Sequence, residues 1–505
     1  MRVLVKYFFW LLSFFSLVIF YLLGTALGQV SLGCFVEDYY SEKMGNKIEV
    51  LSLKIEEYPK IVAEVRINDQ ALLSLNGVAD QEDMNLNYHL RGNTFTWDNY
   101  IIVNPGDVSG KMQGKFSELH IDGKGKLFNG EIEYSFIRKA NRLLDTELTL
   151  KDVDSKLLLD FLKYKDVLMG KIDVLMNFEY FSAYRRKGLV KVKMSKGMMP
   201  ELSEEVDFAL DAEIVVKDLL HEFDADIHSD IGKLRVANGH YNRAAKITTS
   251  DYGLHINELG YFEKFLKHKY SGPLNTAGSI KYDNGDLSLV GDSTSYGGVL
   301  EYDYTNDYLE IDFQGVSLEK FLRQLSFPPL LSSKIYGSAT YDIKDEIILA
   351  NTRLKETRFR RTKMTDTIYE MTGIDVLKDT YNDSLFTAGF QNNILKSLLK
   401  IDNGVNHLYL KNTRMNSKTN AVTADFEVQL DGQKFVGDIY GTLQDPKVNV
   451  DMSQLIQYQI NKQIDSFFGT SKPSTKKNTE KNQVNNFQIE NIERGTRSFL
   501  DGFFD

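Results

Sequence analysis

The chain has 505 residues, with 60 basic and 70 acidic side chains, a net charge of −10 and a single cysteine. This balance argues against a nucleic-acid-binding protein, which needs clustered positive charge, and one cysteine excludes a disulfide framework and cysteine-rich metal sites. With 27 Tyr, 31 Phe and 36 Gly but only 8 Pro, the composition favours pleated strands, tight turns and uninterrupted backbone ladders.

The first 36 residues predict a transmembrane anchor. No charged side chain occurs between Tyr7 and Val36, and about 20 apolar residues cross the hydrocarbon core of a bilayer as a helix. Arg2 and Lys6 precede this segment, which favours an N-terminus left in the cytoplasm and a translocated body. A retained anchor over residues 1–36 is therefore the preferred interpretation.

Two other fates of this segment stay open. Cleavage after the small residues near 26–28 would make it a signal peptide, although its apolar region is longer than the usual 7–15 or so residues. Lipid attachment to Cys34 would make the chain a lipoprotein, but Ser31 and Leu32 stand in the wrong order before that cysteine.

From residue 37 onward, apolar and polar residues alternate in many short segments. Successive side chains of a strand point to opposite faces, so each segment has one apolar and one polar side. The clearest are 84–90, 131–136, 171–178, 206–214, 300–304, 309–313, 422–430 and 435–443. Turn-forming residues at 104–106, 122–123, 283–285, 402–404 and 431–432 predict hairpins. The predicted fold class is all-β with minor α.

Three segments within this pattern, 153–178, 257–282 and 315–341, resemble one another weakly and indicate a repeat. Each copy has a short helical segment that ends in Phe-Leu and a base, at 161–163, 265–267 and 321–323, followed by a strand with an early glycine, Gly170, Gly278 or Gly337. Residues 217–220 are a candidate for a degenerate middle copy. A stacked array predicts such spacing, and chance recurrence of a helix-then-strand pattern is the alternative.

The C-terminal part differs from the body. Residues 454–468 predict an amphipathic helix, and 470–484 predict a flexible linker with nothing to bury. Residues 485–505 are amphipathic again. This tail would suit a partner groove or a membrane surface, or it is a frayed end that packs nowhere.

The sequence predicts no enzyme, cofactor or metal site. Residues 106–111 are one residue short of a phosphate-binding loop, which leaves a turn as the interpretation, and His221-Glu222 has no second histidine at the spacing of a zinc protease. Asp152, Asp154, Asp160 and Asp166 are spread around a helix-like stretch and are expected to be solvated. Arg358, Arg360, Arg361 and Lys363 would meet anionic headgroups or lie on a solvated strand face.

Residues 435–448 carry a family resemblance. Gly441-Thr442-Leu443 is followed by Asp445-Pro446-Lys447, and this segment resembles the closing signature of the AsmA-like family, in which such a strand leads into a helix. The N-terminal anchor and the alternating strands also resemble AsmA and TamB proteins. The chain is much shorter than TamB, and the tail beyond Gly469 has no counterpart.

The resemblance implies a membrane helix at 1–36 followed by an elongated, curled antiparallel β-sheet groove with short helices. The groove would occupy 37–290 and, as an AsmA-like C-terminal region with a closing helix, 291–469. The linker (470–484) and the tail (485–505) would follow. Such proteins are anchored in the bacterial inner membrane with the body in the periplasm. They are associated with phospholipid transport between the membranes and with outer-membrane biogenesis.

The implied partners are phospholipid acyl chains, the inner membrane and outer-membrane or envelope proteins. Candidate lining residues are the apolar members of the alternating strands, although such residues equally fill the core of any β-sandwich or barrel. They are Leu86, Tyr88, Tyr134, Phe136, Met176, Phe178, Tyr302, Tyr304, Ile311, Phe313, Phe426 and Val428. The alternative function is a non-enzymatic assembly module that pairs exposed sheet edges with nascent outer-membrane strands.

Overall fold

A computed structural model describes residues 18, 21–22 and 25–450, apart from short gaps. The gaps are 45, 81, 98–99, 141, 165–168, 183, 200–205, 267–268, 326–328, 330, 362–364, 367–368, 370–374, 383, 431 and 443–445. Most of the predicted anchor lies outside the described residues. The predicted helix 454–468, the linker and the tail lie wholly outside them.

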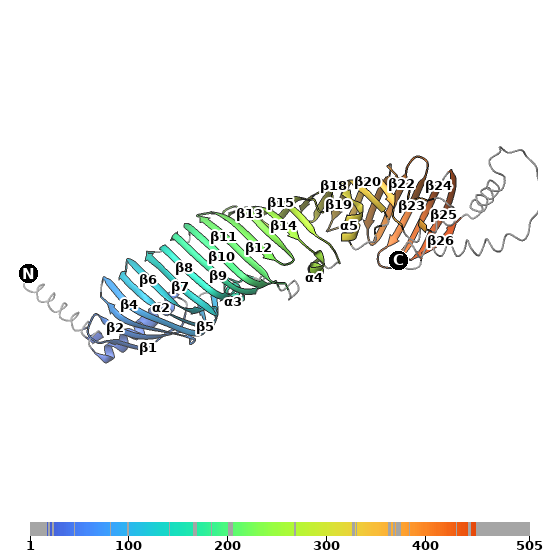
Figure 1. Cartoon of the computed structure of the whole chain (residues 1–505). Coiled ribbons are helices and arrows are strands. Elements are labelled where there is room, and N and C mark those ends of the chain that lie inside the picture. The colour runs from blue at the N-terminus through green and yellow to red at the C-terminus, as the bar shows by residue number, and fades with distance from the viewer. Residues whose placement is uncertain are drawn as a thin grey trace, which may run out of the picture. The chain divides into compact units, whose positions relative to one another are not determined.

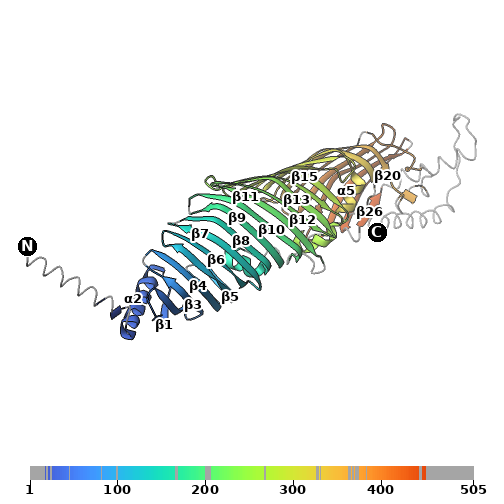
Figure 2. The same ribbon diagram turned by 60° about the vertical axis from the view of Figure 1, so that its left-hand side comes forward.

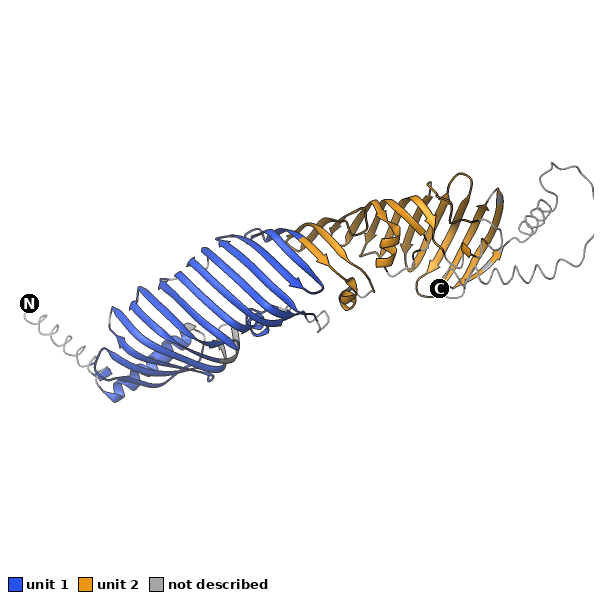
Figure 3. Ribbon diagram, in the orientation of Figure 1, with its two compact units in different colours: residues 1–252 blue, residues 253–505 orange. Residues whose placement is uncertain are grey.

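The described chain is mostly β-structure, with a few helices (Figure 1). Strands β1 to β26 belong to one long antiparallel sheet, which confirms the all-β prediction. Six of the eight alternating segments named above lie wholly in a strand, and 208–214 and 435–442 of the other two also do. The chain forms two compact units, residues 1–252 and 253–505 (Figure 3).

In unit 1, each strand from β1 to β13 pairs antiparallel with the next strand along the chain. Figure 2 shows these strands side by side. The strands are β1 (Ile48–Ile55), β2 (Lys60–Ile67), β3 (Ala71–Ala79), β4 (Asp83–Trp97), β5 (Tyr100–Lys115), β6 (Glu118–Leu127), β7 (Gly130–Lys139), β8 (Arg142–Asp154), β9 (Met169–Phe181), β10 (Arg186–Met198), β11 (Phe208–Lys217), β12 (Leu220–Ser229) and β13 (Gly232–Asn242). The unit boundary falls within β14 (Ile247–Ile256).

Unit 2 has the same sequential pairing from β15 to β26. Its strands are β15 (Leu274–Asp283), β16 (Asp286–Ser293), β17 (Val299–Thr305), β18 (Tyr308–Ser317), β19 (Leu331–Asp342), β20 (Ile347–Phe359), β21 (Ser384–Gln391), β22 (Ile394–Asp402), β23 (His407–Asn416), β24 (Ala421–Leu430), β25 (Gln433–Thr442) and β26 (Pro446–Val450). Both units are therefore meanders, in which local sequence neighbours are also neighbours in space.

The three predicted helical segments are confirmed. They form α3 (Ser155–Leu162), α4 (Glu263–Leu266), which follows the 3₁₀ turn η1 (Leu259–Phe262), and α5 (Leu318–Gln324). The side chains of Asp154 and Ser317 accept hydrogen bonds from the first free backbone N–H groups of α3 and α5, as helix N-caps do. The predicted middle copy at 217–220 is wrong, because these residues form the β11–β12 hairpin with Asp218 in the left-handed region at φ 53°.

Helix α2 (Ala26–Met44) covers the edge strand β1. Glu37 Oε1 accepts from the N–H of Val50 at 3.0 Å, and Ser41 Oγ accepts from that of Ile48 at 3.0 Å. These bonds satisfy groups that an uncovered edge would offer to another strand. Residues 26–36, assigned to the predicted anchor, belong to this helix. Within the described part of the chain, no helix combines the length and apolarity that crossing a membrane requires.

Turns were predicted correctly only in part. The hairpins at 283–285 and 402–404 and the Gly432 turn are present. The predicted turns at 104–106 and 106–111 lie inside β5, and the one at 122–123 lies inside β6. In these two strands, glycine marks a close approach between backbone and side chain.

Candidate functional site

Unit 1 has one apolar face, along which side chains of successive strands line up in register. One row crosses the sheet from β1 to β13, with each member paired to the next. Its members are Leu53, Ala63, Leu75, Tyr88, Gly110, Gly123, Tyr134, Leu148, Met176, Val190, Ile214, Phe223 and Gly239. No polar side chain other than the two tyrosines interrupts it. We call it the central row.

A second apolar row runs beside the central row on the same face from β2 to β13, two residues along each strand and three in β13, where the register shifts. It consists of Val65, Leu73, Leu90, Val108, Gly125, Ile132, Leu150, Val174, Val192, Ala212, Ala225 and Val236. Helix α3 covers part of this face, where its Leu158 and Phe161 pack on the buried cluster around Leu150 and Val174. The strands that carry this apolar surface belong to one antiparallel sheet.

An apolar cavity of about 540 Å³ opens on this face. Its volume is in the range of small-molecule sites. The lining is apolar except for the hydroxyls of Tyr88, Tyr134 and Thr146, and the Thr146 Oγ1 is buried with no hydrogen-bond partner in the described part of the chain. The cavity is lined by Ile67, Leu73, Tyr88, Leu90, Met112, Ile121, Tyr134, Phe136, Leu143, Thr146 and Leu148.

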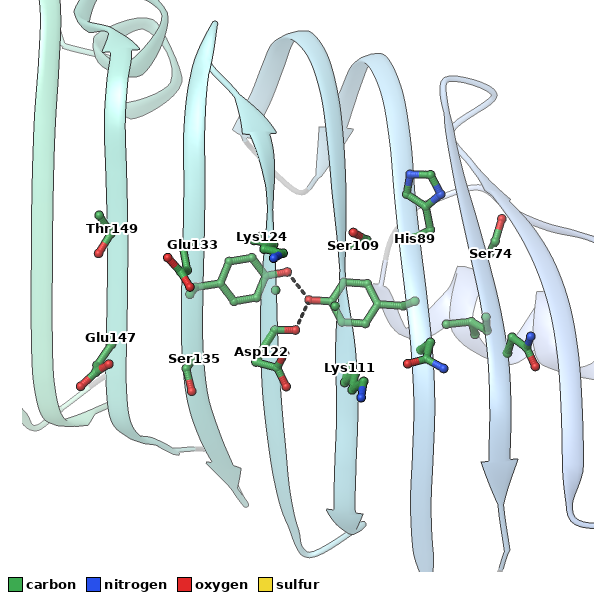
Figure 4. A pocket seen from close by; sticks show the side chains of 17 residues that line it. Ser74, His89, Ser109, Lys111, Asp122, Lys124, Glu133, Ser135, Glu147 and Thr149 are labelled. Carbon is green, nitrogen blue, oxygen red and sulfur yellow. Dashed lines mark hydrogen bonds between the residues drawn. The ribbon is translucent and has the colours of Figure 1, made fainter.

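Two tyrosines of the cavity lining meet over two glycines. The Tyr88 hydroxyl donates to the backbone carbonyl of Asp122 at 2.9 Å and also hydrogen-bonds to the Tyr134 hydroxyl (dashed lines in Figure 4). A Cβ at Gly110 would lie 2.6 Å from the Tyr88 hydroxyl, and one at Gly123 would lie 2.7 Å from Cζ of Tyr134. Burial raises the pKa of both tyrosines. Both therefore stay neutral in the physiological range.

The opposite face of the same strands is polar. It has a depression of about 930 Å³ whose lining includes two cations, Lys111 and Lys124, and two anions, Glu133 and Glu147 (Figure 4). Because the depression is open and carries charges of both signs, we interpret it as a solvated surface. The two faces of unit 1 thus differ in the way that period-two alternation predicts.

Unit 2 repeats the pattern. One row runs through Ile280, Leu289, Tyr304, Leu309, Tyr341, Ile348, Phe390, Leu395, Met415, Val422 and Gly441. Helix α5 covers part of this face, where Phe321 packs edge-on against Tyr296 and Phe313 with ring centroids 5.6 Å apart in both pairs. Burial raises the pKa of Tyr296 to about 12.

All twelve predicted lining residues lie in strands, with their side chains on the apolar faces. Leu86, Tyr88, Phe178 and Phe313 are buried. The other eight are half-buried, and of the twelve, Tyr88, Tyr134 and Phe136 line the cavity. Their contact with lipid stays a prediction.

Sequence reasoning missed most of the cavity lining. Met112 and Ile121 flank the glycines of β5 and β6, and their alternation was obscured because those glycines were interpreted as turns. Leu90 continues the alternation of Leu86 and Tyr88 within the segment 84–90, and Leu73 lies on β3, the neighbouring strand. The pairing register between β7 and β8 is irregular next to Leu143 and Thr146. This irregularity interrupts the period-two alternation of β8, so the alternation alone does not identify these two residues.

The charged motifs singled out in the sequence have structural partners. Arg360 pairs with Glu319, and Arg358 Nε donates to the Thr380 hydroxyl at 3.0 Å; Lys363 and Asp166 lie outside the described residues. Asp154 caps α3. Within the described residues, no group of three or more His, Cys, Asp or Glu side chains could hold a metal ion.

The polar face of unit 2 carries one strongly charged cluster. The Glu427 carboxylate is 3.0 Å from both Lys411 Nζ and Lys434 Nζ and 3.3 Å from His407 Nε2. Hydrogen bonds from Lys411 and Lys434 lower the pKa of Glu427 to about 2. This carboxylate is a structural anion that joins β23, β24 and β25.

Comparison with known proteins gives no relative for this chain: no family model matches it, and no curated protein sequence does.

Proposed function

We propose that the chain is a non-enzymatic protein of the bacterial inner membrane whose periplasmic sheet shelters phospholipid acyl chains on its apolar face. In this way it would serve lipid transport between the membranes and outer-membrane biogenesis. The observation that carries the proposal is the central row of unit 1, an uninterrupted apolar register across thirteen paired strands.

The physical reason is the cost of moving acyl chains through water. Each CH₂ group exposed to water costs about 0.8 kcal/mol, so a two-chain lipid does not cross an aqueous compartment unaided. An apolar row along the sheet gives the chains a surface to lie on. The polar opposite face keeps the protein wetted. The half-buried state of most predicted lining residues leaves apolar area available for such contact.

The resemblance at 435–448 supports the same proposal. The long antiparallel sheet is consistent with a β-groove family of the AsmA and TamB kind. A sheet of this sort is not specific to that family, so the family assignment belongs to the proposal. Pro446 and Lys447 of the resembling segment lie in β26, and the helix expected after it lies outside the described residues.

Site-specific photo-crosslinking in cells tests the proposal. A photoreactive amino acid is placed in the full-length chain at Met176, which is half-buried on the apolar face. The matched control is Asn177, its exposed neighbour on the polar face. Tyr302 and Asp303 provide a second pair in unit 2. We expect phospholipid adducts, identified by mass spectrometry, at Met176 and Tyr302 only. Adducts on both faces or on neither would contradict the proposal.

The assembly-module alternative has less support. It requires an open sheet edge, and at β1 the backbone N–H groups of Ile48 and Val50 are bonded to α2. Crosslinks from β1 or β26 to precursors of outer-membrane barrels, together with no lipid adduct at Met176, would favour it over lipid transport.

A further inference from the structure

The rim of the apolar face of unit 1 carries two arginines and a histidine. Arg186 begins β10, two residues before Gly188, whose pairing with Phe178 puts both positions on the apolar face. His221 lies on the same face of β12, paired with Val216 and Tyr241. Arg243 directly follows β13 and donates its backbone N–H to the carbonyl of Leu219 at 2.8 Å. The three side chains come from three adjacent hairpin ends.

Arg186 is held in place but keeps most of its donors. Its guanidinium lies over the ring of Phe181, 4.8 Å from the centroid, and its Nε donates to the carbonyl of Ser182 at 3.2 Å. The two terminal nitrogens have no ion-pair partner among the described residues, and the same holds for the guanidinium of Arg243. Burial lowers the pKa of Arg186, and the charge of Arg243 lowers it further. Two cations therefore lie close enough to repel each other.

The imidazole of His221 is a third polar group on this rim of the apolar face. Its Nε2 is buried and has no hydrogen-bond partner among the described residues, and its ring meets that of Tyr241 edge-on, with the centroids 5.5 Å apart. Burial lowers the pKa of His221, and the charges of Arg186 and Arg243 lower it further. A buried nitrogen without a partner beside two cations is costly unless a ligand completes the site.

The carboxylate of Asp218, which contacts the backbone of Arg186, is already engaged by other groups. Asp218 Oδ1 accepts from the backbone N–H of Arg186 at 3.1 Å and from the Tyr180 hydroxyl at 3.2 Å, and it lies 3.7 Å from Arg185 Nε. It neutralises Arg185 and organises the hairpins. The charge of Arg186 and Arg243 on the apolar face remains uncompensated by the described residues.

From this arrangement we infer that Arg186, Arg243 and His221 form a subsite for the phosphate of an amphiphile whose acyl chains lie on the central row. The inference rests on the proposed function. Arginine is the side chain best matched to phosphate oxygens, which it binds through two parallel hydrogen bonds. Phe223 of the central row is two residues from His221 on β12, about 7 Å away along a strand. The site therefore places charge at the rim and apolar surface directly inside it.

The hairpin tips around the site suit a lipid headgroup better than a free anion. Tyr184, Leu219 and Leu220 are exposed there, Tyr184 at 87%. Aromatic and aliphatic side chains beside arginines are typical of surfaces that meet the boundary between lipid and water. We therefore assign the phosphate to a lipid and make free phosphate an outcome of the test.

The test uses the full-length chain with a photoreactive amino acid at Met176. It is offered either phosphatidylglycerol or diacylglycerol with the same acyl chains, each in neutral detergent micelles. We expect the phosphate-bearing lipid to give at least about tenfold more adduct, since charged hydrogen bonds of this kind contribute about 1.5–3 kcal/mol. The double variant Arg186→Gln and Arg243→Gln should bring the ratio close to one and leave the diacylglycerol adduct unchanged.

Arg185→Gln is the matched control, because Arg185 lies on the same hairpin but is paired with Asp218; it should keep the preference. Equal labelling by both lipids in the unaltered chain, or an unchanged ratio in the double variant, would overturn the phosphate subsite. Absence of any adduct with either lipid would instead count against the proposed function. Loss of the preference in micromolar inorganic phosphate would overturn the lipid assignment in favour of free phosphate.

The pKa of His221 gives an independent measurement. A bound anion favours the protonated imidazole, so phosphatidylglycerol should raise the pKa of His221 and diacylglycerol should not. Histidine NMR titration, assigned with His221→Asn, follows this shift. A His221 pKa that is the same with both lipids would contradict the inference.

Discussion

At the scale of single residues, Gly123 shows how the absence of a side chain shapes the apolar face. It lies mid-strand between Gly110 and Tyr134 in the central row. The space its missing side chain leaves is filled by the rings of Tyr88 and Tyr134, whose hydroxyls meet there. The glycines thus let two large rings lie flat against the sheet and keep the cavity open above them.

Replacing Gly123 with alanine should therefore destabilise the protein. The new Cβ would overlap the Tyr88 hydroxyl and the Tyr134 ring, and overpacking of this kind costs about 1–3 kcal/mol. Denaturant unfolding followed by circular dichroism measures the loss. Gly253→Ala is the control, because a Cβ there meets nothing within 4 Å. A Gly123→Ala protein as stable as this control would show that the tyrosines move aside freely.

The lowered pKa of Glu427 leads to a prediction about how the stability of the protein depends on pH. Its pKa in the folded chain is about 2, below the ordinary 4.5, because Lys411 and Lys434 donate hydrogen bonds to it. A lowered folded pKa means that its stabilisation is present above about pH 4.5 and is lost as the pH falls towards 2. Glu427→Gln should lose stability at pH 7 by about 1 kcal/mol, since both lysines are partly exposed.

The same variant should be less sensitive to acid. Thermal unfolding between pH 6 and pH 3 measures the slope, and the difference between the native chain and Glu427→Gln should shrink as the pH falls. A difference that stays constant over this range would mean that the carboxylate contributes by packing rather than by charge.

At the scale of elements, the sequence predicted the strands and helices whose formation depends on local periodicity. The eight alternating segments are strands and the Phe-Leu segments are α3, α4 and α5, because a strand or helix face is determined by residues two to four positions apart. Asp122-Gly123 was misinterpreted as a turn because its role depends on tyrosines one and two strands away. The rim site of Arg186, His221 and Arg243 was missed for the same reason: only the register brings these residues together.

Helix α3 lies on the apolar face, and its cap determines how firmly it stays there. The Asp154 carboxylate accepts from the backbone N–H of Lys156 at 3.0 Å and of Leu157 at 3.4 Å. Asp154→Ala should destabilise the helix by about 1 kcal/mol and speed amide hydrogen exchange over 155–162. Asp154→Asn keeps an acceptor and is the control. Equal exchange in both variants would mean that packing of Phe161 and Leu158 alone holds the helix.

At the scale of the whole molecule, each unit has its own apolar rows, and each row is only one residue wide on any strand. A row of this kind behaves as a path in series if acyl chains move along it, so one charged position interrupts it. If the rows were instead independent resting places for lipid, each charge would remove only its own place. The two cases differ in how substitutions in separate units combine.

Met176→Asp in unit 1 and Tyr304→Asp in unit 2 distinguish them. An unpaired carboxylate on an apolar row must be desolvated when an acyl chain covers it, which costs about 1–3 kcal/mol or more, so each variant should slow lipid transfer between donor and acceptor vesicles about tenfold or more. For a path in series, the double variant should be little slower than the slower single one. If the rows are separate resting places, each single variant should lose only the share of the transfer rate that its own unit carries, and the two losses should add in the double variant. Asn177→Asp, on the polar face, should transfer lipid at the unaltered rate, and slowing there would mean that added charge itself, not its place on the apolar row, is responsible.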